Sequence, residues 1–207
     1  MWFRPNKTRF LFVTHNENKV SEIRKMFPPQ HELISLNEIG FKEEIPETGT
    51  TLEENALQKA ATIYQHEGHP AFADDTGLEV DALDGKPGVH TARFAGEDAT
   101  DQENVRKLLN DLQREENRKA RFRTVIALIM NNKEELFEGT VEGTIAHEPS
   151  GDKGFGYDPV FIPEGYDRTF AEMTLEEKNQ LSHRSRAFNK FLRHINMGEV
   201  KSMRFWF

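Results

Sequence analysis

The sequence predicts an α/β protein built on a long, twisted sheet that mixes parallel and antiparallel strands. Residues 9–14, RFLFVT, form a β-rich run that passes through the polar turn HNENK into a helical pattern. This order is typical of the β–α unit that connects parallel strands. Residues 122–147 instead hold two β-rich runs joined by a short turn, which predicts an antiparallel hairpin. Both kinds of pairing in one chain indicate a mixed sheet.

The first helix and the second strand follow directly. Val20, Ile23, Met26 and Phe27 recur at helical spacing, so the segment KVSEIRKMF is expected to be a helix with one apolar face. The chain returns through HELISL as a second strand and then enters a long acidic segment, NEIGFKEEIPETGT, without periodicity. A loop of that length in a compact domain is usually functional or mobile.

Three later helices are predicted from their N-terminal capping boxes. In each, a Thr is followed three residues later by a Glu, so that the two side chains can bond the first free N–H groups of the helix. The pairs are Thr51 with Glu54, Thr100 with Glu103, and Thr174 with Glu177. They predict helices over 52–66, 101–116 and 175–195.

Strand-like runs lie between these helices. They are PAFADDT, LEVDAL, RFRTVIALIM, ELFEGTVEGTIAHE and DPVFIP, and the turns DGKPG, NNKEE and PSGDKGFG separate several of them. No repeat, low-complexity stretch or linker-like composition interrupts the chain. We therefore expect one domain over residues 1–207.

Composition excludes several classes of function. A net charge of -8 argues against a surface that coats nucleic acid, although a few clustered cations would still permit a polyphosphate ligand. The absence of cysteine excludes disulfides, thiolate zinc sites and cysteine nucleophiles. The longest apolar run, VIALIM, is too short to cross a membrane, and the N-terminus lacks the apolar stretch of a secretory signal. We expect a cytoplasmic protein.

Two adjacent aspartates, Asp74 and Asp75, follow an apolar run at the expected end of a strand. Successive strand side chains point to opposite faces, so one carboxylate can face a cleft while the other caps backbone or faces water. The competing interpretation is ordinary turn chemistry before Thr-Gly. Together with Glu47 in the acidic loop, however, these hard oxygens suit Mg²⁺, which takes one or two carboxylates and completes its shell with water and phosphate.

Three other segments combine residues suited to a ligand. THNENK, at the first strand-to-helix turn, offers backbone N–H groups, a hydroxyl, an amide and Lys19 to an anion; the alternative is a helix capped by Asn16 with a solvated lysine. GDKGFGYDP could bring exposed backbone and an aromatic ring to a planar base, or be a hairpin loop with an aromatic plug. Lys178, His183 and Arg184 could donate to a substrate, or form a solvated basic face.

The order of these segments resembles the Ham1-like family of noncanonical purine nucleoside triphosphate pyrophosphatases. The likeness spans roughly residues 9–195 and rests on FVTHNENK, PETGTTLEENALQKA, FADDTGLEVDALDGKPGVHTARFAG, FEGTVEG, GFGYDPVF and EEKNQLSHRSRA. The resemblance implies an elongated α/β fold whose two lobes flank a central cleft, assembled as a homodimer. It also implies Mg²⁺-dependent hydrolysis of inosine, deoxyinosine and xanthosine triphosphates to the monophosphate and pyrophosphate, which removes them from the nucleotide pool.

The resemblance also implies roles for individual residues. Asp75 would be the general base, and Asp74 would support the turn or position a neighbouring group of the site. The implied phosphate-binding residues are Thr14, Asn16, Lys19 and Lys59, and the metal-binding carboxylates are Glu47 and Asp75. Thr76 is an implied substrate contact, and the implied base-recognition set is Phe155, Gly156, Tyr157, Asp158, Lys178, His183 and Arg184.

This chain departs from the family pattern at His15, where the family commonly has glycine. A side chain there would narrow the approach to the phosphates or shift the backbone of the turn. The ends, including the aromatic tail Phe205 to Phe207, have no family counterpart; the tail would pack on its own domain or join an interface. Two other functions stay open: a related pyrophosphatase for other modified nucleotides, and a non-catalytic nucleotide sensor. Retention of Glu47, Asp75 and Lys19 favours an enzyme.

Overall fold

The computed structural model describes residues 7–203, without the side chains of Asn18, Glu22 and residues 197–203. The predicted aromatic tail, Phe205 to Phe207, lies outside the described residues. The strands are β1 (Thr8–Phe12), β2 (His31–Ser35), β3 (Ala71–Val80), β4 (Pro87–Gly88), β5 (Lys119–Met130), β6 (Lys133–Ile145) and β7 (Phe161–Pro163). The helices are α1 (Glu17–Met26), α2 (Leu52–Glu67), α3 (Asp101–Asp111), α4 (Leu175–Leu181) and α5 (His183–Met203).

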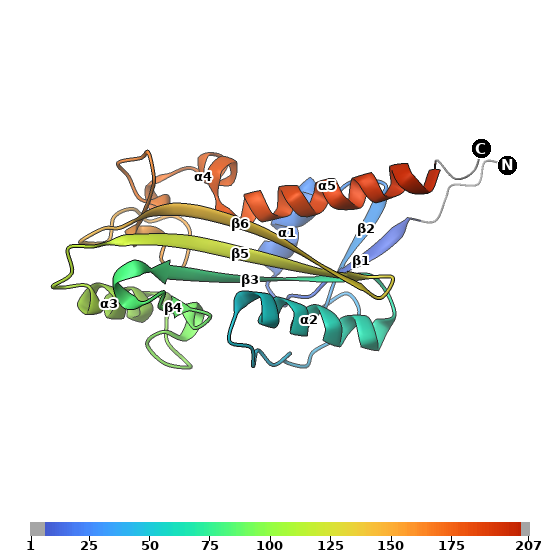
Figure 1. Cartoon of the computed structure of the whole chain (residues 1–207), viewed down its shortest axis with the longest axis horizontal. Helices are drawn as coiled ribbons and strands as arrows, with labels where there is room; N and C mark the ends of the chain where they lie inside the picture. Colours follow the sequence, from blue (N-terminus) through green and yellow to red (C-terminus); the bar gives the residue numbers. More distant parts are fainter. Residues whose placement is uncertain (1–6, 204–207) are drawn as a thin grey trace. The chain divides into compact units, whose positions relative to one another are not determined.

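The described strands form one mixed sheet, which confirms the predicted fold class. Its order is β2-β1-β3-β5-β6-β7, with β4 paired to β3 (Figure 1). β1 is parallel to both β2 and β3, whereas β3 pairs β4 and β6 pairs β7 in antiparallel fashion. Within residues 7–203, no helix has both the length and the apolar character that a membrane crossing requires.

The chain divides into two compact units. The first comprises residues 1–74, 125–137 and 188–207, and the second comprises 75–124 and 138–187. β3, β5, β6 and α5 contribute residues to both units. A cleft between two lobes stays a prediction.

The first unit is built around stacked phenylalanines. Phe12 of β1 stacks on Phe72 of β3 at 4.7 Å between ring centroids, and Phe191 of α5 lies 4.7 Å from Phe72. All three side chains are fully buried. Because Phe12 pairs with Phe72 in the parallel register, the turn after β1 emerges beside the stretch of β3 that carries Asp74.

The second unit has its own core. Phe122 of β5 packs against Phe161 of β7, at 4.7 Å between centroids, and Phe161 packs against Phe170 at 5.1 Å. Leu78 of β3 and Leu108 of α3 complete this cluster. Burial of this many aromatic side chains orders the loops on either side of β7, including the segment GDKGFGYDP.

Two predicted helices differ from the observed ones. The helix expected over 101–116 ends at Asp111, where the Leu112 carbonyl accepts a hydrogen bond from the Arg118 guanidinium at 3.0 Å. The single helix expected over 175–195 is wrong, because Ser182 is extended, with φ −67° and ψ 151°. Its hydroxyl accepts from the Ser185 N–H at 3.2 Å, so Ser182 caps a new helix, α5.

β3 also differs from the prediction. PAFADDT and the start of LEVDAL, expected as separate runs, form a single strand that ends at Val80, and Asp81–Leu83 form a 3-10 helix. Asp74 and Asp75 therefore lie within β3 rather than at its end. Pairing with β1 on one stretch and with β4 on the next overrides the local turn preference of Asp-Thr-Gly.

Candidate active site

The two adjacent aspartates have different environments. Asp74 is only 3% exposed, and both its carboxylate oxygens accept from Lys19 Nζ, at 3.1 and 2.8 Å. Asp75, on the opposite face of the strand, is partly exposed. Of the two roles expected for Asp74, this contact fits the positioning of a neighbouring group rather than the support of a turn. Asp74 anchors Lys19, whose predicted partner is a phosphate.

The turn between β1 and α1 is capped as the simpler interpretation predicts. The Asn16 side-chain oxygen accepts from the Lys19 N–H at 3.2 Å, and the Asn16 N–H donates to the Thr14 hydroxyl at 3.2 Å. The Lys19 side chain, however, is bound to Asp74 rather than solvated. The turn thus brings together Thr14, Asn16 and Lys19 at the N-terminus of α1, where the helix dipole favours an anion.

His15 contacts the acidic loop. Its Nε2 lies 3.1 Å from the Glu43 carbonyl oxygen, and the ring is exposed. The side chain that replaces the usual glycine therefore joins the phosphate turn to the loop that carries Glu47.

Glu47 and Lys59 form an ion pair in the first unit. Lys59 Nζ of α2 donates to Glu47 Oε1 at 2.6 Å, and the Lys59 side chain is 12% exposed. The family resemblance assigns these residues to separate sets, one for the metal and one for phosphate. The structure brings them into direct contact.

The donor chemistry of Glu47 and Asp75 suits Mg²⁺. Both offer carboxylate oxygens, and the described part of the chain holds no group of three or more His, Asp or Glu residues arranged for a metal ion. Carboxylate oxygens are ligands that Mg²⁺ accepts, and this ion takes most of its remaining ligands from water and substrate phosphates. Glu47 belongs to the first unit and Asp75 to the second.

The second unit gathers most of the predicted base-recognition residues around Phe155. This ring is 57% exposed. Lys178 Nζ lies 5.0 Å from its centroid, and the Arg184 guanidinium carbon 5.5 Å from it. Lys178 also donates to Asp158 Oδ2, which accepts the Phe155 N–H at 3.0 Å as well. An exposed aromatic face beside two cationic donors can hold a planar base that carries acceptor oxygens.

Three residues predicted to contact the substrate bond or stack with other residues of the protein. The Tyr157 ring is buried in the core and its hydroxyl donates to the Thr91 carbonyl at 3.1 Å; burial, followed by the charge of Asp101, raises its pKa. His183 is buried and stacks on Phe122 at 4.7 Å. The Thr76 hydroxyl shares a hydrogen bond of 2.7 Å with Thr124.

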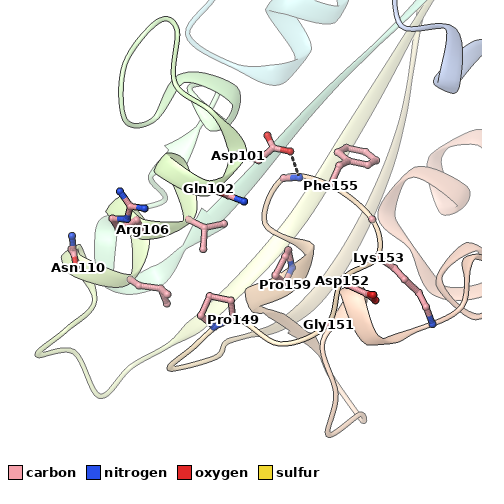
Figure 2. A pocket seen from close by; sticks show the side chains of 14 residues that line it. Asp101, Gln102, Arg106, Asn110, Pro149, Gly151, Asp152, Lys153, Phe155 and Pro159 are labelled. Carbon is pink, nitrogen blue, oxygen red and sulfur yellow. Dashed lines mark hydrogen bonds between the residues drawn. The ribbon is translucent and has the colours of Figure 1, made fainter.

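A pocket of about 690 Å³ lies on the α3 side of the loop that carries Phe155. Figure 2 shows it between α3 and residues 149–159, and it also shows the hydrogen bond of 2.7 Å from the Gly156 N–H to Asp101 Oδ2. The contact of Asp101 with this loop was not predicted from the sequence. Asp101 is the first residue of a capped helix, and nothing in its local pattern indicates a hydrogen bond to a loop 55 residues away. This hydrogen bond holds the predicted base-recognition loop to α3.

Comparison with known proteins now identifies the family. The model of the Ham1 family matches residues 10–194. The chain belongs to the Ham1 family.

Two proteins named dITP/XTP pyrophosphatase are similar to this chain along most of their length. The protein of Porphyromonas gingivalis is 55% identical over 86% of this chain and 93% of its own, and that of Christiangramia forsetii is 48% identical over 91% and 99%.

Solved structures of the Ham1 family share the fold. The Ham1 protein of Staphylococcus aureus superposes with a TM-score of 0.88 at 36% identity, covering 92% of this chain and all of its own. This chain therefore shares its fold with that Ham1 protein over most of its length.

Proposed function

We propose that this Ham1 chain hydrolyses noncanonical purine nucleoside triphosphates, namely dITP, XTP and ITP, to the monophosphate and pyrophosphate. The observation that carries the proposal is the exposed Phe155 ring with Lys178 and Arg184 beside it. The similar proteins of Christiangramia forsetii and Porphyromonas gingivalis are named dITP/XTP pyrophosphatase, which supports the same substrate class.

Selectivity would come from the 6-position of the purine. Lys178 and Arg184 are donors only, so they can pair with the 6-keto oxygen of hypoxanthine or xanthine. Against the 6-amino group of adenine each of these donors would face another donor and would gain no hydrogen bond from the base. We therefore expect adenosine triphosphates to be poor substrates.

The triphosphate would lie against the capped turn and the lysines of the first unit. Thr14, Asn16 and Lys19 meet at the N-terminus of α1, and Lys59 projects from α2. Glu47 and Asp75 would hold Mg²⁺, which when bound neutralises charge on the phosphate oxygens. Lys19 is already positioned by Asp74, which lowers the conformational cost of binding the anion.

Asp75 would act as the general base. Asp75 is partly exposed as a residue although its Oδ2 is buried, and its carboxylate would take a proton from a water molecule whose oxygen attacks the α-phosphorus. The new bond joins the water oxygen to that phosphorus, the bond to the bridging oxygen breaks, and pyrophosphate leaves with its electron pair. The nucleoside monophosphate keeps the attacking oxygen.

The family resemblance further supports a cytoplasmic homodimer as part of this proposal. Light scattering of the purified protein should then give twice the 23.9 kDa mass of one chain. A monomer at micromolar concentration would remove the dimer from the proposal and leave the activity untouched.

Product analysis in ¹⁸O-labelled water tests the reaction. Phosphorus NMR should detect pyrophosphate and dIMP from dITP, with the label in dIMP. Orthophosphate with dIDP, or a label in pyrophosphate, would contradict attack at the α-phosphorus. Binding of dITP without any product would instead favour a nucleotide sensor.

A further inference from the structure

We propose that Lys59 competes with the metal ion for the Glu47 carboxylate. When metal and nucleotide bind, Lys59 leaves Glu47 and binds the triphosphate. The ion pair between Lys59 and Glu47 is called the latch below. The inference deepens the proposed function, on which it rests for the identity of the metal and the nucleotide. It starts from one contact: Lys59 Nζ donates to Glu47 Oε1 at 2.6 Å, with the two side chains 12% and 31% exposed.

The segment that carries Glu47 does not need Lys59 to hold it in place. The Thr48 N–H donates to the side-chain oxygen of Gln58 at 3.0 Å, and the Gly49 N–H donates to that of Asn55 at 2.8 Å. These bonds join residues 48 and 49 to the same helix, α2. Loss of Lys59 should therefore leave Glu47 in position and change only the charge beside it.

Gly49 makes this close attachment possible. A Cβ at this position would lie 2.6 Å from Glu54 Cβ and 2.8 Å from Asn55 Oδ1, so only glycine fits against α2. The Thr50 N–H then donates to Glu54 Oε2 at 2.6 Å, which continues the attachment to the N-terminus of the helix. Backbone contacts thus hold residues 48–50, next to Glu47, against α2, whereas Lys59 contributes an ammonium group to the carboxylate itself.

An ammonium group and a divalent cation cannot share this carboxylate without opposing one another. Like charges a few ångströms apart repel strongly in a part-buried site, where screening by water is incomplete. Metal binding should therefore weaken the bond between Lys59 and Glu47, and the coupling acts equally in both directions. The lysine released in this way becomes available to the phosphates that arrive with the metal.

The test measures metal binding without nucleotide, using Mn²⁺ as the probe and electron paramagnetic resonance to detect the unbound ion. We expect Lys59→Met to bind Mn²⁺ about tenfold more tightly than the natural protein, within the usual range of coupling between sites. Met and Lys have similar helix propensity, so α2 should be unaffected. Lys59→Arg keeps a cation and should bind Mn²⁺ as the natural protein does.

Two further variants separate the latch from a general charge effect. Lys133→Met removes the same charge from an exposed position on the hairpin between β5 and β6, and it should leave Mn²⁺ affinity unchanged. In the Glu47→Gln background, Lys59→Met should no longer increase the affinity. In the presence of metal, Lys59→Met should bind a non-hydrolysable α,β-imido analogue of dITP about tenfold more weakly.

The outcomes are distinct. Equal or weaker Mn²⁺ binding by Lys59→Met, or no binding at millimolar metal, would overturn the latch. A gain that persists in the Glu47→Gln background would also overturn it, because the competition would then lie elsewhere. A gain in Mn²⁺ affinity in a protein that releases no pyrophosphate would support the latch and contradict only the proposed reaction.

Discussion

At the scale of single residues, the alternation of β3 separates two carboxylates that are neighbours in sequence. Asp74 is buried against Lys19, whereas Asp75 is partly exposed. A carboxylate whose oxygens are held by an ammonium group is a poor base, because protonation would cost it that partner. The exposed member of the pair is therefore the better candidate for activating water.

Replacement of Asp75 tests this assignment. We expect Asp75→Asn to bind dITP but to lose turnover by at least about a hundredfold, the usual contribution of a positioned base. Steady-state pyrophosphate release and equilibrium binding measure the two effects separately. Turnover close to that of the natural protein would exclude Asp75 from the mechanism.

Gly154 makes the pairing of Asp158 with Lys178 possible. Its φ is +76°, and a Cβ at this position would collide with the Asp158 carboxylate. We expect Gly154→Ala to displace Asp158 and to raise the KM for dITP about tenfold, since small misplacements of a contact group are costly.

Gly165→Ala is the matched control for this substitution. Gly165 has φ +86°, but a Cβ added there would meet nothing within 4 Å, so the alanine shares the backbone strain without the collision. Both variants should lose about 1–2 kcal/mol of unfolding free energy, yet only Gly154→Ala should change KM. An equal change of KM in both would show that strain alone is responsible.

At the scale of elements, helix starts could be predicted and helix breaks could not. Thr51 and Gly68 bound α2 almost where the sequence places it, because both caps are encoded in local residues. The break at Ser182 was missed because apolar residues such as Phe188 and Phe191 continue at helical spacing beyond it. A serine that caps a helix has the same local pattern as one on the exposed face of a helix.

The contribution that Glu177, in the cap of α4, makes to the stability of the folded state depends on pH. The Thr174 N–H, followed by Arg168, lowers the pKa of Glu177 to about 2. A carboxylate with a lowered pKa stabilises the folded state above its ordinary pKa, about 4.3, and this contribution is lost as the pH falls toward 2.

NMR titration of Glu177 checks this dependence. Thr174→Ala removes the hydroxyl that also bonds Glu177 and keeps the backbone N–H, so it should move the Glu177 midpoint upward by only part of the way to the ordinary glutamate value. Thr51→Ala, at the start of α2, should leave it unchanged. The same midpoint in both variants would mean that the cap does not control this carboxylate.

At the scale of the whole molecule, the fold class could be predicted from the sequence, whereas the pairing of the residues assigned to the site could not; their roles stay predictions. The contact between Lys19 and Asp74 joins residues 55 apart and depends on the register of β1 against β3. The contacts of Lys59 with Glu47 and of Lys178 with Asp158 depend likewise on folded loops. In all three, a lysine assigned to substrate is held by a carboxylate.

The most direct test of the proposed activity compares pyrophosphate release from dITP and dATP, each with Mg²⁺ and with excess chelator. The account predicts rapid, Mg²⁺-dependent release from dITP and a kcat/KM for dATP about a hundredfold lower, because the adenine amino group cannot accept a hydrogen bond from the donors near Phe155. Equal kcat/KM values for the two nucleotides, or release from dITP that persists in chelator, would contradict it.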